Sequence, residues 1–510
     1  MLKNDVIRLV KTLSTTEKRQ FKLHCRKQSG DRAYLSLFDI IDQTQFKDIE
    51  QLEDKFKLSN PKASFETTAN YLLKTVTDSL ISARGEKDSP FEQMQNYMRA
   101  KVLFDRALIN EGFKELKKVQ RSASVSQNHL MEYMAYREEL HMLSALNFPD
   151  IDDNHVIEMQ MKNKSTLKTL LQVHEHNSLF DLLKIRLINT GKTTSELAKR
   201  NLNDLLLSEL SLVTSKVAYN FESTKLHLMF QSFFFTSIGD YKSALKTFSE
   251  LNTLFELNIE KPSASPADYL SSLEGILDSL RTIRAYSEMP FYISKVNSLF
   301  NLKNSEPFNQ RIVKAAVTFQ LNYLTGTNKF KEALEFTARH NNLLQNEAVI
   351  TDYEQHCELL FYCGLAHYGK NEFEKALRHI NKITMLGKAN YRFAIYKAAK
   401  LLGILIRYEL GDIDYIHYEI RAYKRQSRTK GEALKIEKLI FKVVMLDPNN
   451  NSLVKNNLLL KKLETAMKHI TNDKYELQVL KFYDFLNWIQ FKFTTSRIKT
   501  KHAAKNPISQ

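Results

Sequence analysis

The sequence predicts an all-α fold made of stacked helical hairpins, an α-solenoid. Its 510 residues include only 13 Gly and 9 Pro, well below average usages of roughly 7% and 5%, so few positions break a helix. Alternating Val-rich runs bounded by Gly or Asn-Gly turns, the pattern of strands in a sheet, are missing from the sequence. The third observation is a short phrase that recurs four times at nearly regular intervals.

This phrase has an aromatic or aliphatic anchor that is followed, in three of its four copies, by Ala three residues later. The anchors are Tyr241, Phe330, Phe373 and Ile413, so the intervals are 89, 43 and 40 residues. The first interval is close to twice the others, which indicates a period of about 40 residues, typical of helical repeat proteins.

Residues 1–88 are predicted to form a separate helical module. Ser14 and Glu17 have the spacing of a capping box, in which each side chain bonds a free amide at a helix start. A longer helix is predicted from Ser64 to Ala83. The module is either a cap on the end of the solenoid or a winged or helix-turn-helix relative. Its 16 Lys/Arg and 13 Asp/Glu in residues 1–90 favour the cap.

The rest of the chain divides into three further parts. Residues 91–259 are expected to form degenerate hairpins, and the segment from Lys261 to Pro266 is the clearest linker. Residues 267–495 are expected to carry the better repeats and a basic C-terminal end, and residues 496–510 a polar tail.

Two copies of the phrase resemble the tetratricopeptide repeat. In that family a small residue on the first helix lets the second helix approach, and an aromatic residue and then a small one follow the turn. Around Phe373, the small pair is Gly364 and Ala376. The copy at Ile413 departs, because Ile416 replaces the small residue, so looser helix packing is expected there. The repeat-packing residues predicted in this way are Gly239, Tyr241, Ala244, Phe330, Ala333, Gly364, Phe373 and Ala376.

The whole chain looks similar to large bacterial proteins of this superfamily. The resemblance implies a right-handed α-solenoid of tetratricopeptide-like hairpins, with a groove for a peptide or protein partner. Because one fold supports many functions, the expectation is a general one, a non-enzymatic scaffold for protein–protein interaction.

The segments that resemble nucleotide-binding or metal-binding motifs are better explained as parts of the helical repeats. The segment from Gly364 to Lys370 nearly matches a phosphate-binding loop, but Asn371 stands where a Ser or Thr must bind magnesium. His356, Cys363 and His367 share one helical stripe and are types that zinc accepts. However, two of them fall where the repeat requires packing residues. No G-x-S-x-G, H-E-x-x-H or Gly-x-Gly motif occurs, so the sequence predicts no catalytic residue, metal or cofactor.

The net charge of +16 is concentrated at one end, where residues 421–510 hold 19 Lys/Arg and 7 Asp/Glu. Four basic residues in this end have i, i+3, i+4, i+7 spacing and so lie on one face of a helix, and a fifth follows them. Together they are a candidate surface for an anionic partner. It consists of Arg421, Lys424, Arg425, Arg428 and Lys430. The alternative is a solvated charged face. If this end or the N-terminal module binds DNA or RNA, the protein would instead be a nucleic-acid-associated regulator.

Cysteine usage and hydropathy indicate the compartment. Three cysteines, an odd and low count, suit a reducing environment. No uninterrupted apolar run reaches the ~18 residues of a membrane span, and the N-terminus lacks a signal-peptide pattern. A cytoplasmic protein with no membrane contact is therefore expected, while the oligomeric state is left open.

Overall fold

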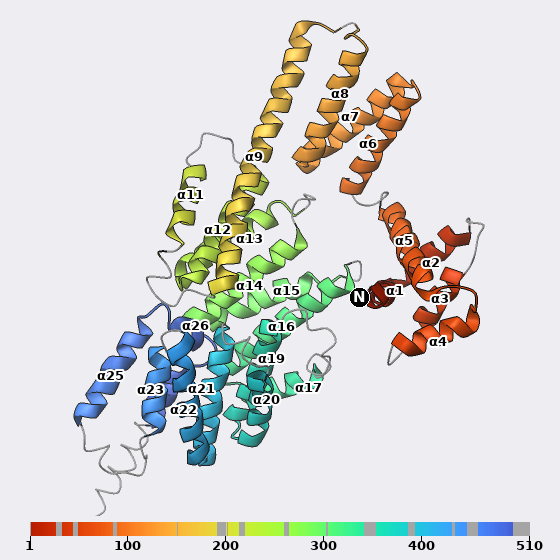
Figure 1. Ribbon diagram of the computed structural model, residues 1–510. Helices are drawn as coiled ribbons and strands as arrows, with labels where there is room; N and C mark the ends of the chain where they lie inside the picture. Colours follow the sequence, from red (N-terminus) through yellow and green to blue (C-terminus); the bar gives the residue numbers. More distant parts are fainter. Residues whose placement is uncertain are drawn as a thin grey trace, which may run out of the picture. The chain divides into compact units, whose positions relative to one another are not determined.

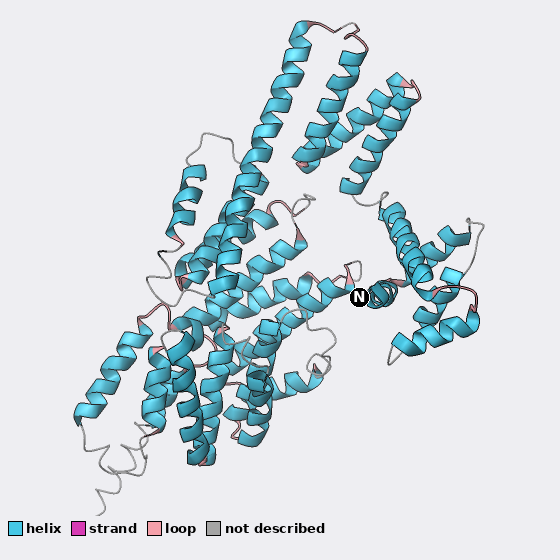
Figure 2. Ribbon diagram, viewed as in Figure 1, coloured by secondary structure: helices cyan, strands magenta, loops and turns pink. Residues whose placement is uncertain are grey.

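Helices form all the regular structure of the described residues, and none of these residues belongs to a strand (Figure 2). This confirms the all-α prediction. None of the described helices is both long and apolar enough to cross a membrane. The computed structural model describes residues 2–26, 33–43, 49–84, 89–149, 151–190, 200, 202–213, 220–259, 265–301, 304–340, 353–385, 393–430, 434–445 and 457–492.

The chain divides into two compact units, with the boundary between Leu171 and Gln172, inside one long helix. The helices of the first unit, drawn from red to yellow in Figure 1, are α1 (Leu2–Thr12), α2 (Thr15–Arg26), α3 (Ala33–Gln43), α4 (Ile49–Ser59), α5 (Phe65–Arg84), α6 (Ser89–Asp105), α7 (Ile109–Ser126), α8 (His129–Ala145) and the first part of α9 (Asp153–Thr190). The sequence-based boundaries near 88 and 260 lie in or beside residues 85–88 and 260–264, which are outside the described part.

Helices α1 to α5 have a hydrophobic core of their own, centred on Leu37, Phe38 and Ile41. The capping box at the start of α2 has both of its reciprocal contacts: the backbone N–H of Ser14 donates to the Glu17 carboxylate at 2.8 Å, and the N–H of Glu17 donates to Ser14 Oγ at 3.3 Å. Helix α5 begins and ends one residue later than the sequence predicts.

The second unit continues from the last part of α9. Its other helices are α11 (Asn203–Val213), α12 (Phe221–Ser237), α13 (Tyr241–Glu256), α14 (Pro266–Ile283), η1 (Tyr286–Glu288), α15 (Met289–Ser298), α16 (Glu306–Gly326), α17 (Phe330–Arg339), α19 (Tyr353–Gly369), α20 (Phe373–Met385), α21 (Ala394–Leu410), α22 (Ile413–Lys430), α23 (Lys435–Val444), α25 (Asn457–Thr471) and α26 (Leu477–Leu480) (Figure 1). A further helical stretch covers residues 485–492.

Five successive helix pairs form a stack in the second unit. The pairs are α12–α13, α14–α15, α16–α17, α19–α20 and α21–α22, and the two helices of each pair pack together. The first helix of each pair also contacts the first helix of the next, as α12 does with α14 and α19 with α21. Repeated hairpin-on-hairpin contact is the arrangement of a helical solenoid.

The anchors of the recurring phrase do not all pack alike. Tyr241 is 2% exposed, whereas Ile413, in the last copy, is 60% exposed. A Cβ at Gly364 would lie 3.0 Å from Ile380 Cδ1, so the small residue on α19 allows α20 to approach closely. The remaining predicted packing residues lie in the same hairpins: Ala244, Ala333 and Ala376 are fully buried, and Phe330 and Phe373 are partly buried.

Residues 473–492 return to the beginning of the second unit. Lys474 Nζ forms an ion pair of 2.8 Å with Asp240, in the turn between α12 and α13. At the same turn, Gly239 has φ +76°, and a Cβ on it would lie 2.4 Å from the carbonyl oxygen of Lys474. The Glu476 carboxylate accepts hydrogen bonds from two backbone amides at the start of α23. Helices separated by more than 200 residues are thereby joined.

Candidate functional site

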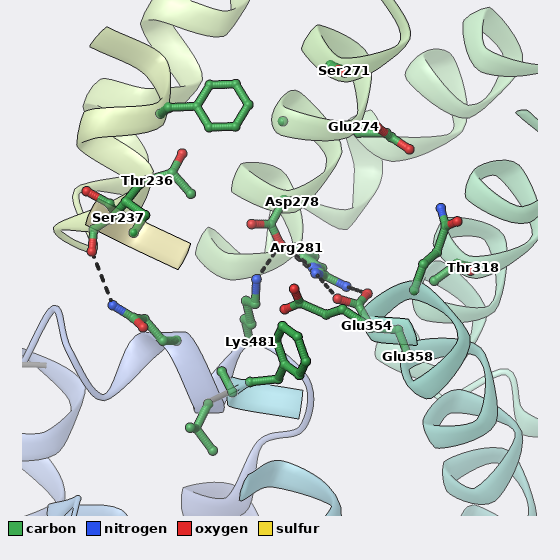
Figure 3. Close-up of a pocket in the computed structure, with 18 of the residues that line it drawn as sticks. Thr236, Ser237, Ser271, Glu274, Asp278, Arg281, Thr318, Glu354, Glu358 and Lys481 are labelled. Atoms are coloured by element: carbon green, nitrogen blue, oxygen red, sulfur yellow. Dashed lines mark hydrogen bonds and ion pairs between the residues drawn. The ribbon is translucent and has the colours of Figure 1, made fainter. Parts of the chain in front are cut away.

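A cavity of about 590 Å³ lies among the first helices of the five hairpins in the second unit. Its walls come from α12, α14, α16, α19 and α21, with contributions from the end of α9 and from residues 475–481 (Figure 3). Because consecutive first helices are neighbours, they present side chains that are far apart in the sequence to one space.

Helix α14 supplies one polar wall of this cavity. Its start is fixed by Pro266 and by the Ser265 hydroxyl, which accepts a hydrogen bond from the N–H of Asp268 at 3.4 Å. Glu274, Asp278 and Arg281 follow at steps of four and three residues, so they lie on one face of the helix and line the cavity.

The same helix carries the glycine that shapes an apolar wall. A Cβ on Gly275 would lie 2.3 to 2.5 Å from ring atoms of Phe248 on α13, and both residues line the cavity. Only a residue without a side chain allows the ring to pack at this place, because real Cβ atoms do not approach so closely.

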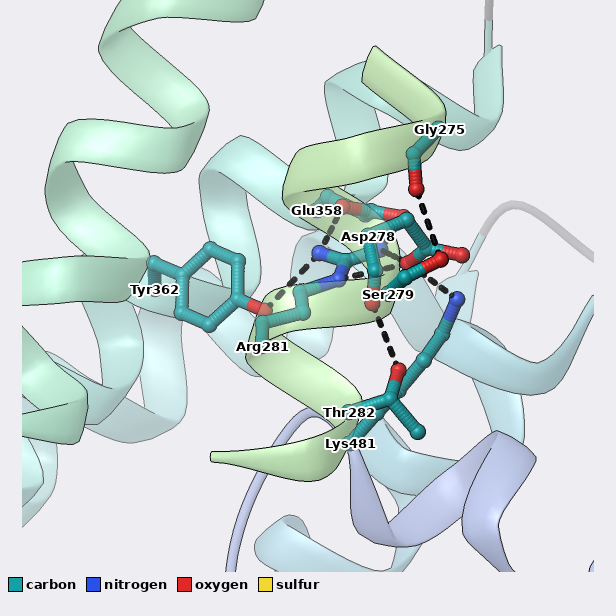
Figure 4. Close-up of polar contacts among 8 residues, drawn as sticks. All are labelled: Gly275, Asp278, Ser279, Arg281, Thr282, Glu358, Tyr362 and Lys481. Atoms are coloured by element: carbon teal, nitrogen blue, oxygen red, sulfur yellow. Dashed lines mark hydrogen bonds and ion pairs between the residues drawn. The ribbon is translucent and has the colours of Figure 1, made fainter. Parts of the chain in front are cut away.

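Arg281 is the centre of a buried charge network (Figure 4). Its side chain is 3% exposed and binds Glu358 of α19 through two parallel contacts, of 2.6 and 3.1 Å. Its Nε donates to Asp278 at 2.7 Å and its Nη1 to the Tyr362 hydroxyl at 3.1 Å. Burial opposes the charged form, but the surrounding carboxylates outweigh it and hold the pKa of Arg281 well above its ordinary value.

Lys481 completes the network from the C-terminal segment. Its Nζ lies 2.7 Å from Asp278 Oδ1, and the side chain is almost fully buried. Two cations and two carboxylates therefore neutralise one another at the inner end of the cavity, since a buried charge must be paired. A second, more exposed pair lies nearer solvent, where Arg311 of α16 contacts Glu274 at 2.6 Å and Ser271 Oγ at 2.9 Å.

The candidate anionic-partner surface predicted from the sequence is described only at its first residue. Arg421, on α22, is exposed, and its Nε donates to the backbone carbonyl of His417 at 3.2 Å. The side chains of Lys424, Arg425, Arg428 and Lys430 lie outside the described part of the structure, so this surface stays a prediction.

Other lysines of the basic C-terminal end form ion pairs. Lys435 pairs with Asp473, Lys474 with Asp240, Lys481 with Asp278, and Lys492 with Glu409, at distances of 2.5 to 2.8 Å. These contacts use part of the positive charge of residues 421–510 within the protein itself.

The potential metal ligands on α19 are buried or contact other side chains. Cys363 is fully buried, and burial raises the pKa of its thiol to about 12. His367 contacts the Glu372 carboxylate at 2.8 Å and stacks on His379, whose pKa burial lowers to about 4. Among the described residues, no group of three or more His, Cys, Asp or Glu side chains could hold a metal ion.

The segment that resembles a phosphate-binding loop forms the last turns of α19. Helix α19 extends to Gly369, and a Cβ on this residue would lie 2.4 Å from the Phe330 ring. These residues therefore pack against a neighbouring helix, and Lys370 and Asn371 form the turn that follows.

The residues of the Arg281 network are not among those predicted from the sequence. The pairs Arg281–Glu358 and Lys481–Asp278 join residues 77 and 203 positions apart, and no local spacing connects them. The local signal was the Glu274, Asp278, Arg281 stripe, which borders the leucine-rich face of the same helix.

Stacked helical hairpins occur in repeat proteins of unrelated functions. Comparisons of this sequence with models of known families and with curated proteins find no match. The structure itself assigns the fold class, an all-α arrangement of stacked helical hairpins in the described residues.

Proposed function

We propose that this protein is a non-enzymatic interaction scaffold that holds a peptide segment of a protein partner in the cavity of the second unit. The supporting observation is the cavity itself, whose walls combine four Phe side chains with a few convergent polar groups. Its volume falls within the roughly 300 to 1,000 Å³ that is usual for binding sites.

The ionisable groups of the cavity favour binding over catalysis. None of the lining residues that the structure describes is a His or a Cys, the types most often used for proton transfer and nucleophilic attack near neutral pH. Asp278 and Glu358 are held by Arg281 and Lys481. Carboxylate oxygens that are already engaged by buried cations are poorly placed to take a proton from a substrate.

We also infer that the stack is the right-handed, tetratricopeptide-like solenoid that the sequence resembles. The close approach of α19 and α20 at Gly364 and the burial of Tyr241, Ala333 and Ala376 support this inference. Helices α1 to α5 would then act as the N-terminal cap. Cys25, Cys357 and Cys363 are buried and form no disulfide among the described residues, which fits a cytoplasmic location.

Selection from a displayed library of random octapeptides tests the proposed function. Wild-type protein is compared with two variants that fill the cavity, Ser271→Trp and Ala394→Trp, and with Ser294→Trp on the exposed side of α15 as a control. We expect wild type and the control to enrich peptides that both cavity variants, checked for folding by circular dichroism, fail to retain. Enrichment that survives both cavity substitutions, or no enrichment by wild type, contradicts the proposal.

A nucleic-acid-associated regulator is the second candidate, supported by the charge excess of residues 421–510. Binding of short DNA and RNA duplexes and single strands would then weaken steeply with salt. It would also be lost when Arg421, Lys424, Arg425 and Arg428 are all replaced by Glu. Undetectable or salt-insensitive binding removes this candidate.

A further inference from the structure

The charges that line the cavity do not cancel. Five basic side chains face four acidic ones in the lining. The basic residues are Lys184, Arg281, Arg311, Lys397 and Lys481, and the acidic residues are Glu274, Asp278, Glu354 and Glu358. The cavity therefore has one net positive charge.

Outside the ion pairs of the lining stand two lysines, Lys184 and Lys397, and one carboxylate, Glu354. Arg281, Arg311 and Lys481 each form ion pairs with acidic lining residues. Lys184 and Lys397 form no ion pair with any residue that the structure describes, and Lys184 Nζ instead lies 4.2 Å from the centre of the Phe180 ring. Their ammonium groups are the ones that remain for a ligand.

A buried hydroxyl in the same cavity is an independent indication of a missing partner. Thr318 of α16 is 2% exposed and lines the cavity, yet its Oγ1 has no hydrogen-bond partner among the described residues (Figure 3). A buried hydroxyl without a partner destabilises the folded protein, and such groups are uncommon in folded proteins.

The remaining surface of the cavity is mainly aromatic. Phe233, Phe248, Phe319 and Phe393 come from four different parts of the second unit and line the same space as the lysines. Aromatic side chains favour a ligand that has an aromatic or large aliphatic group of its own.

We propose that the segment bound in this cavity is acidic. A carboxylate of the ligand meets the ammonium groups of Lys184 and Lys397, and Thr318 Oγ1 donates a hydrogen bond to a ligand oxygen. A neighbouring aromatic or aliphatic side chain of the ligand packs among the Phe rings. Charge-assisted contacts supply specificity, and burial of the apolar group supplies affinity. This inference rests on the proposed peptide-binding function.

The test uses the same octapeptide library with Phe fixed at its centre. Wild type is compared with Lys184→Gln/Lys397→Gln and with a matched control, Lys246→Gln/Lys442→Gln, which removes two exposed lysines outside the cavity. We expect Asp and Glu to be enriched at least three-fold over the input library by wild type and by the control. The Lys184→Gln/Lys397→Gln variant should show no such enrichment.

Affinities of synthetic peptides complete the test. The best selected peptide, with fluorescein attached, should bind at least ten-fold more tightly than its copy with Asn and Gln in place of Asp and Glu. The Lys184→Gln/Lys397→Gln variant should bind both alike, and Thr318→Val should weaken the acidic peptide. Cavity-dependent binding without acidic preference refutes this inference and leaves the proposed function intact. Binding that Ser271→Trp does not reduce refutes the proposed function as well.

Discussion

Replacing Arg281 by Met measures how much the buried charge network contributes to the stability of the second unit. Methionine has a similar length but no charge, so the substitution removes the cation and leaves the packing volume nearly unchanged. Lys481 still neutralises Asp278 after the change. Glu358, whose side chain is 12% exposed, loses the partner that binds it through two contacts.

The expected loss follows from this geometry. Removing one partner of a buried ion pair typically costs about 3–5 kcal/mol, because the remaining charge stays buried without compensation. The second unit has roughly 330 residues, and an unfolding entropy of roughly 2.1 cal/mol/K per residue amounts to about 0.7 kcal/mol/K. The melting temperature should therefore fall by about 4–7 °C.

Thermal unfolding followed by circular dichroism at 222 nm provides the measurement, and Arg311→Met is the matched control. Arg311 also binds a Glu on the neighbouring first helix at 2.6 Å, but its side chain is 39% exposed. Exposed pairs contribute about 0–1 kcal/mol, so the control should lower the melting temperature by less than about 1.5 °C. In the double variant Arg281→Met/Glu358→Leu, part of the lost stability should return, because no charge is left unpaired.

Equal shifts for Arg281→Met and Arg311→Met would refute the reasoning, since burial would then make no difference to the strength of these pairs. A further loss in the double variant would show that Glu358 is solvated once Arg281 is gone.

Three other predictions concern protonation, backbone and thiols. Burial lowers the pKa of His176, so the unfolded chain binds a proton at this side chain more readily than the folded protein does. The stability of the protein should therefore fall as the pH decreases below about 6.5. The decrease in melting temperature from pH 7.5 to 5.5 should be smaller in His176→Phe. Gly239→Ala should destabilise the protein at least twice as much as Gly411→Ala, as measured by urea denaturation, because both have φ +76° but only Gly239 has a backbone atom in the way. All three buried cysteines should react with a thiol reagent at pH 8 only after denaturation, since burial raises the pKa of Cys25 and Cys363; rapid labelling of the native protein would contradict this.

Local patterns in the sequence were sufficient to predict much of the fold. The capping box at Ser14 and the bounds of α5 depend on residues a few positions apart, and both are found in the structure. The helical hairpins follow from the spacing of buried residues such as Tyr241 and Ala376. These interactions are local, so a single sequence contains the information that specifies them.

The candidate site could not be predicted in the same way. Arg281 looks like an ordinary charged residue on an amphipathic helix until α19 brings Glu358 to it and the C-terminal segment brings Lys481 to its neighbour Asp278. The sequence drew attention instead to the basic stripe that begins at Arg421, because there the charges are neighbours along one helix. Convergence of distant residues depends on tertiary packing, which spacing does not reveal.

The contact between Lys474 and the turn at Gly239 has a consequence for the synthesis of this protein. An open repeat array can begin to fold as each hairpin leaves the ribosome, because every repeat needs only its neighbours. Here the partner of Asp240, Lys474, is synthesised 234 residues later. Synthesis of that stretch takes roughly 10–50 s at translation rates of about 5–20 residues per second. During that interval Asp240 and Asp278 lack the lysines that neutralise them in the folded protein, so the last step of folding must wait for the C-terminal segment.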